Sequence, residues 1–157
     1  MKTVAISLAV VWLAVTAGLA QSAPPKASAS AAPVATPRNV GSMSDLMVKI
    51  IYPTSDALFY VESRTPQTDA EWTVLEGQAL MLAESANLLM MPGRARDQKQ
   101  WMADARLMLD AGARAVKAAK TKNVEAIAAL SDDLLASCTT CHRHYRPGYG
   151  QPKPPGQ

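Results

Sequence analysis

The sequence predicts an all-α protein, folded as an antiparallel four-helix bundle of up-down-up-down topology. Apolar residues recur at three-and-four spacing through most of residues 42–146, which is the period of an amphipathic helix. The same stretch shows few β-branched runs, no strict alternation and no Asn-Gly hairpin turn. Four such helices joined by short loops bury their apolar faces most simply against one another.

The first twenty residues have the pattern of a secretory signal peptide. Lys2 supplies a positive charge, an apolar run follows over 4–15, and Gly18 and Ala20 are small residues at the positions that signal peptidase reads. The apolar run is too short for a comfortable membrane span, although an uncleaved N-terminal anchor is the alternative interpretation. We therefore expect residues 1–20 to be removed on export to the periplasm.

Two further segments flank the predicted domain. Residues 21–41 are rich in Ala, Pro and Ser and predict a flexible linker, and residues 147–157 predict an irregular Pro/Gly-rich tail. Residues 42–146 remain as one domain, which is long enough to bury a single core but not two.

The first predicted helix has Ser44 available as a cap and Pro53 within its run. Because proline lacks a backbone N–H, we expect Pro53 to kink the helix or tighten a turn. The apolar positions of this helix are Met43, Leu46, Met47, Ile50, Ile51, Leu58 and Val61.

A capping box at Thr68 and Glu71 predicts the start of the second helix, and Met91-Pro-Gly93 predicts its end. Its apolar positions are Trp72, Leu75, Ala79, Leu82, Ala86 and Leu89. The third helix is predicted from about 97 to 120, with an inner face of Trp101, Ala105, Met108, Gly112, Ala115 and Ala119. Its small residues either leave room for a bulky group between helices or allow two helices to approach closely.

Asn123 predicts the start of the fourth helix, which must end before Pro147. Its inner face comprises Ile127, Leu130, Leu134, Cys138, Cys141 and Tyr145. The end of this helix, SCTTCHRHYRPGYG, holds both cysteines and both histidines of the chain.

Cys138, Cys141 and His142 form a C-x-x-C-H motif, which is the attachment signature of a c-type haem. On a helix these residues lie on neighbouring faces. Two thiols at this spacing can reach two vinyl groups on one edge of a porphyrin, and His142 can then place an imidazole nitrogen on the iron.

Three other interpretations compete with haem attachment. A disulfide between Cys138 and Cys141 would close only a very small loop, with little stabilising value. A redox-active pair belongs at a helix N-terminus, whereas this pair lies near a helix C-terminus. A zinc site that adds His142 and His144 would need Cys141 and His142, adjacent in sequence, to bind one tetrahedral ion. We expect His144 to be a solvated residue at the helix end.

The run Cys138-Thr-Thr-Cys-His142-Arg-His-Tyr145-Arg146 resembles the C-x-x-C-H-x-x-Y-R motif of the class II cytochromes c, the cytochrome c′ family. The resemblance implies one covalent haem c, held by thioether bonds from Cys138 and Cys141 and by axial His142. It also implies that Arg146 lies beside the haem on its proximal side. The first helix departs from the family, because Met43 stands where many members carry arginine.

Met47 is the candidate sixth ligand of the iron. In an up-down-up-down bundle the end of the last helix lies beside the start of the first, so Met47 should lie opposite His142. Met47 as an ordinary core residue is the alternative, and Met43 is a second candidate. Histidine–methionine ligation suits electron transfer, whereas a vacant sixth position suits the binding of nitric oxide or carbon monoxide.

No catalytic Ser-His-Asp set, paired carboxylates or phosphate loop is visible, so we do not expect an enzyme. The net charge of +3 is not arranged as a basic stripe with interleaved aromatic residues, which argues against nucleic acid as a partner. The expected partners are redox proteins, small gas molecules in the alternative function, and a second copy of the chain, since members of this family often dimerise.

Overall fold

The structure is a computed structural model that describes residues 36–151, and all regular structure in that range is helical. The predicted signal peptide and most of the predicted linker therefore lie outside the described residues. The helical segments are α1 (Met43–Leu46), the π-helical turn η1 (Met47–Ile51), α2 (Tyr52–Phe59), α3 (Asp69–Met90), α4 (Gln100–Lys120), α5 (Val124–Ala128) and α6 (Ser131–Tyr145). The prediction of an all-α fold is confirmed.

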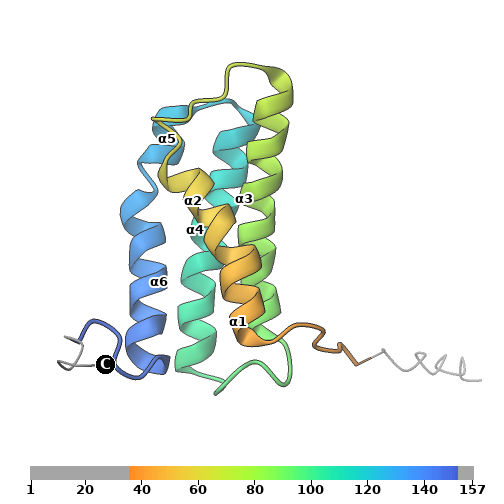
Figure 1. Ribbon diagram of the computed structural model, residues 1–157, viewed down its shortest axis with the longest axis vertical. Helices are drawn as coiled ribbons and strands as arrows, with labels where there is room; N and C mark the ends of the chain where they lie inside the picture. The colour runs from red at the N-terminus through yellow and green to blue at the C-terminus, as the bar shows by residue number, and fades with distance from the viewer. Residues whose placement is uncertain (1–35, 152–157) are drawn as a thin grey trace, which may run out of the picture. The chain divides into compact units, whose positions relative to one another are not determined.

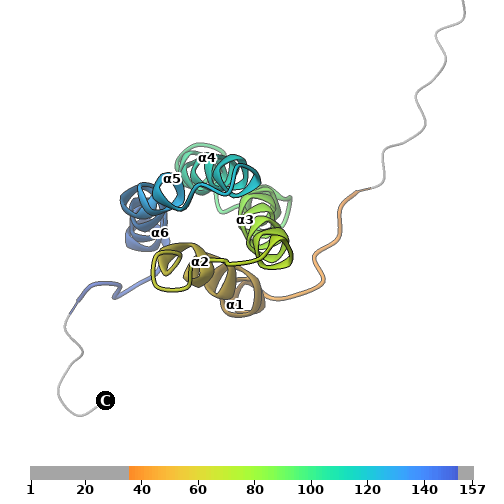
Figure 2. The same ribbon diagram turned by 90° about the horizontal axis from the view of Figure 1, so that it is seen from above.

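The helical segments lie side by side around one apolar interior (Figures 1 and 2). α1, η1 and α2 follow one another in a single continuous rod, which we call the N-terminal rod. α3 packs extensively on α4, α4 packs on α6, and α2 packs on α3, but α2 and α6 make few contacts. The N-terminal rod and α6 are thus neighbours with a weakly packed seam between them.

The N-terminal rod is capped two residues earlier than predicted. Ser42, and not Ser44, caps α1: its hydroxyl accepts from the Asp45 N–H, and the Asp45 carboxylate accepts from the Ser42 N–H at 3.0 Å. This reciprocal pair satisfies backbone donors that a helix start leaves free.

The helical run continues through Pro53, and a π-helical turn precedes the proline. The Tyr52 N–H bonds to the Met47 carbonyl, five residues back, which widens the backbone just before the proline. The Thr54 hydroxyl donates to the carbonyls of Ile50 and Ile51, at 2.7 and 3.0 Å. These bonds occupy acceptors near the point where proline removes a donor.

The second predicted helix corresponds to α3. Thr68 and Glu71 form the predicted capping box, and the predicted apolar positions from Trp72 to Leu89 are all buried. The helix ends at Met90, and Gly93 adopts a φ of 80°, a left-handed conformation that favours glycine.

α4 begins at Gln100, slightly later than predicted, because the Asp97 carboxylate accepts from the N–H groups of Lys99 and Trp101. The small residues of α4 serve mainly close packing. A Cβ on Gly112 would lie 2.9 Å from the backbone of Ala83 on α3, so the two helices approach as closely as glycine permits. At the other end of this face, Ala105 borders an interior cavity.

The last predicted helix is divided into α5 and α6. Asn123 caps α5 as predicted, with its side chain accepting from the Ala126 N–H at 2.8 Å. The chain then tightens, since the Leu130 N–H bonds to the Ile127 carbonyl three residues back, before α6 begins. Within residues 36–151, no helix has the length and apolar character needed to cross a membrane.

Candidate functional site

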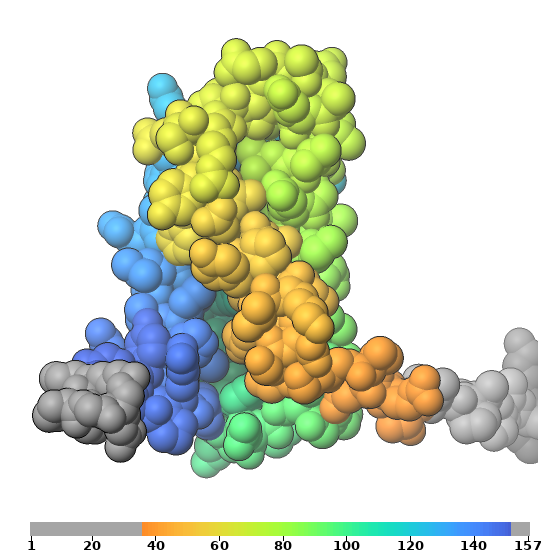
Figure 3. Space-filling model, in the orientation of Figure 1, coloured from red at the N-terminus to blue at the C-terminus, as the bar shows by residue number. Residues whose placement is uncertain are grey.

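A groove follows the seam between the N-terminal rod and α6. It has a volume of about 1820 Å³, including space open to solvent, and Figure 3 shows this face with the rod and α6 on either side of a recess. Residues from both sides line it, among them Met47, Ile51, Tyr52, Leu135, Cys138 and His142. The weakly packed seam is therefore also where the C-x-x-C-H motif lies.

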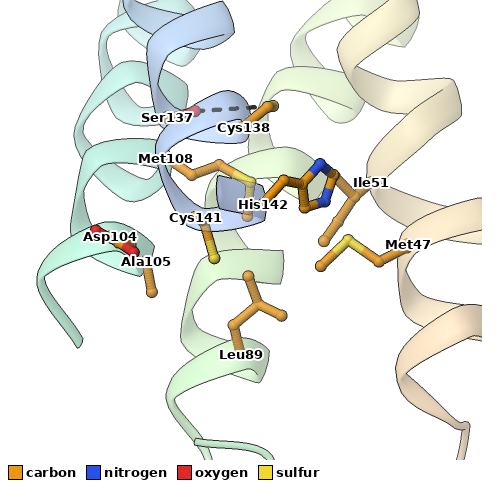
Figure 4. Close-up of a pocket in the computed structure, with 10 residues that line it drawn as sticks. All are labelled: Met47, Ile51, Leu89, Asp104, Ala105, Met108, Ser137, Cys138, Cys141 and His142. Atoms are coloured by element: carbon orange, nitrogen blue, oxygen red, sulfur yellow. Dashed lines mark hydrogen bonds between the residues drawn. The ribbon is translucent and has the colours of Figure 1, made fainter. Parts of the chain in front are cut away.

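A smaller space of about 380 Å³ shares residues with this groove (Figure 4), and this volume and the next also include space open to solvent. It is lined by η1, α3, α4 and α6, through Met47, Ile51, Leu89, Asp104, Ala105, Met108, Ser137, Cys138, Cys141 and His142. A third cavity of about 580 Å³ opens beside it toward Arg96 and Arg146. Met47 and His142 line all three spaces, so they mark the point where the spaces meet.

Both cysteines are free thiols, and both are only half-buried on α6. Burial raises the pKa of the Cys138 thiol. Burial, and secondarily the charge of Asp104, raises the pKa of the Cys141 thiol to about 11. Redox-active cysteine pairs depend on the opposite shift, a lowered thiol pKa, so these shifts weigh against the redox interpretation.

His142 lies on the turn of α6 that follows Cys141. Partial burial, and then the charge of Arg146, lowers the pKa of its imidazole. The ring is therefore neutral near pH 7, which is the form that binds metal ions. The edge of the Tyr149 ring packs on it, with ring centroids 5.1 Å apart.

Met47 begins η1 and is half-buried. Figure 4 shows its thioether next to the imidazole of His142, across the seam between η1 and α6. Met43 lies one turn earlier and lines only the third cavity. The structure thus brings Met47 and His142 together as the sequence predicts, while ligation of a metal by Met47 stays a prediction.

Arg146 follows α6 as its C-terminal cap and lines two of the three spaces. Its guanidinium lies 5.8 Å from the centroid of the Tyr149 ring. The sequence analysis placed Tyr149 in an irregular tail, but a turn brings it back to the groove, with Gly148 and Gly150 at φ of 73° and 74°. No sequence signal identified Tyr149 as part of the site.

The sequence analysis also missed Asp104, which is buried on α4 at 2% exposure. His144 is exposed in the last turn of α6, as expected, but its Nδ1 also lies 2.7 Å from the Asp104 carboxylate. A signal existed: Asp104 stands at helical spacing from Trp101 and Met108, on the apolar face of α4.

These residues fit a covalently attached haem. The two thiols stand on one helix, both border the apolar interior, and a neutral imidazole lies directly beyond them. The N-terminal rod leaves the facing seam weakly packed. Within residues 36–151, no three His, Cys, Asp or Glu side chains gather as a potential metal site.

Comparisons with protein-family models, with curated proteins and with solved structures found no match to this chain.

Proposed function

We propose that this protein is a periplasmic monohaem c-type cytochrome that carries electrons between redox partner proteins. One observation carries the proposal: Cys138, Cys141 and His142 converge on an apolar interior space that Met47 borders from the opposite helix. The proposal includes the up-down-up-down antiparallel bundle of the cytochrome c′ family, which would place the start of the first helix beside the end of the last. It also includes export by the signal peptide of residues 1–20.

Attachment of the cofactor needs no oxidant. Each thiol would supply both its sulfur and its hydrogen to one vinyl group of the haem, so that the vinyl double bond becomes single and nothing else is consumed. Cys138 and Cys141 would each form one such thioether. Burial keeps both side chains protonated near pH 7, so the thiol hydrogens needed for this addition are present.

The other residues of the site have separate roles. His142 would offer a neutral nitrogen to the iron, and Met47 a soft sulfur from the other side of the seam. Haem iron held between imidazole and thioether exchanges single electrons at a raised potential. Leu89, Ile51 and Met108 line the inner cavity with apolar atoms and limit access of water. Arg146 would lie on the proximal side.

The alternative function is binding of nitric oxide or carbon monoxide. The observation that favours it is the apolar cavity beside Met47, which would suit a small neutral gas if Met47 remained a core residue. In that case only His142 would bind the iron. The two functions share the attachment site and differ in the role of Met47.

The proposal is tested by expressing the chain together with a cytochrome c maturation system. After denaturing electrophoresis, haem stain should remain on the polypeptide, because thioether bonds survive denaturation. The double variant Cys138→Ala, Cys141→Ala should lose the stain. Thr139→Ala with Thr140→Ala, in the same turn but with both thiols intact, is the matched control and should keep it. Release of the stain from the unmutated chain would contradict covalent attachment.

A further inference from the structure

Two carboxylates near the start of α4 bond the last turn of α6. The Asp104 Oδ2 atom lies 2.7 Å from Nδ1 of His144. The hydroxyl of the next residue, Tyr145, donates to Oδ2 of Asp97, and Oδ1 of Asp97 accepts from the N–H groups of Lys99 and Trp101 at the start of α4. The turn that carries His142 is therefore bonded at two consecutive positions, to α4 and to the segment just before it.

Asp104 is the unusual member of this set, because it is almost fully buried. Its other oxygen accepts from Nε2 of Gln100 at 2.8 Å, so both oxygens have a partner. A buried charge is costly even when paired, and an apolar side chain of similar size often gives equal or greater stability. Asp104 also lines the inner cavity together with Cys141 and His142 (Figure 4). Stability alone does not account for a carboxylate at this place.

The aromatic residues beside these bonds make the α4 side of the turn rigid. The Tyr145 ring packs edge-on against Trp101, with centroids 4.8 Å apart. Trp101 is buried, and its Nε1–H donates to the Leu89 carbonyl of α3 at 2.8 Å. On its other side, α6 has few contacts with α2. The last turn of α6 is therefore held in position mainly by its contacts with α4.

We propose that Asp104, assisted by Asp97, is a positioning residue for the haem site, an inference that rests on the proposed function. It holds the end of α6 so that His142 stays directed across the seam at Met47. It also places a buried negative charge beside the cofactor cavity. That charge favours ferric over ferrous iron and so lowers the reduction potential, because ferric haem carries one more positive charge and the surroundings screen weakly.

The test compares Asp104→Asn with Asp133→Asn in the haem-loaded protein. Asp133 is a close control: it also joins α4 to α6, through Arg114 at 2.7 Å, but the pair is exposed and none of the three spaces of the site includes it. In Asp104→Asn the potential should shift upward and the ferric spectrum should change. Amide hydrogen exchange should also become faster over residues 141–146, where the Arg146 N–H bonds to the His142 carbonyl at 2.9 Å. Asp133→Asn should leave all three quantities unchanged.

The same potential and the same exchange rates in Asp104→Asn and Asp133→Asn would overturn the inference. His144→Gln provides a second test at a partly exposed side chain, 42% accessible, whose replacement should not prevent folding. It removes the imidazole partner and should also accelerate exchange over 141–146; unchanged exchange there would overturn the positioning role. Absence of covalent haem from the unmutated chain would instead contradict the proposed function. In that case, amide hydrogen exchange over residues 141–146 would still test whether Asp104 positions the end of α6.

Discussion

The α3–α4 interface and the seam between the N-terminal rod and α6 are packed in opposite ways. At the first, Gly112 lies against the Ala83 backbone so closely that a single added carbon has no room. At the second, two helical segments make few contacts and leave a groove lined by Cys138 and His142. The two α3–α4 helices are thus packed as tightly as a protein core allows, whereas the seam keeps open space beside Cys138 and His142.

If haem is bound as proposed, its loss should have the largest effect on stability, and that effect should be concentrated at the seam. With Cys138, Cys141 and His142 all replaced by alanine, the seam has nothing to fill it, and binding energy that would otherwise stabilise the fold is lost. We expect this apoprotein to be molten or largely unfolded by circular dichroism, with residual amide protection concentrated in α3 and α4. A cooperative melt close to that of the haem-loaded protein would show that the seam is stable without its cofactor.

Met47→Ala should have the next largest effect, confined to the seam. If its sulfur binds the iron, the unmutated ferric protein is low-spin, with a weak near-infrared band from the iron–thioether bond. The variant should become high-spin, have a lower potential, and bind carbon monoxide and nitric oxide much faster. Met43→Ala, one turn away, is the control and should change little. A high-spin spectrum in the unmutated protein would favour gas binding over electron transport.

Replacing each of two glycines with alanine tests how closely α3 and α4 are packed. Gly112→Ala forces a carbon against the α3 backbone, which should lower the free energy of unfolding by about 1–3 kcal/mol. The higher helix propensity of alanine should offset up to about 1 kcal/mol of this loss. Gly77, in the middle of α3, has nothing near its added carbon. Gly77→Ala should therefore raise stability by about 0.5–1 kcal/mol. Chemical denaturation measures both, and equal effects would contradict close packing at Gly112.

The smallest expected effect is a loss of stability at alkaline pH, through the contact between Tyr145 of α6 and Asp97 just before α4. Burial, and then hydrogen bonding to Asp97, raises the pKa of Tyr145 to about 12. Because this value exceeds the pKa of about 10 of a free tyrosine, the stabilisation is fully present below pH 10 and disappears as the pH rises through 12. Tyrosinate absorbance should show one late step, which Tyr145→Phe removes and Tyr60→Phe does not. Titration of Tyr145 near pH 10 would contradict the buried contact.

Much of the fold could be predicted because helix signals are local. The capping box at Thr68, the cap at Asn123 and the apolar period of α3 all act within a few residues, and the structure has each of them. Predictions were less accurate where two local effects compete. Ser42 caps α1 in place of Ser44, and a π-helical turn, which the sequence analysis did not predict, precedes Pro53.

The sequence by itself determined which residues form the C-x-x-C-H motif, because the spacing of Cys138, Cys141 and His142 on one helix depends only on helix geometry. Only the tertiary structure decided what faces that helix. The bond between Asp104 and His144 joins residues forty positions apart, and the return of Tyr149 to the groove depends on a turn after α6. Likewise, the small residues of α4 were compatible with a cavity or with close packing until Ala83 was found against Gly112. Local periodicity states which side chains point inward, but the partner that each one meets depends on how distant segments pack.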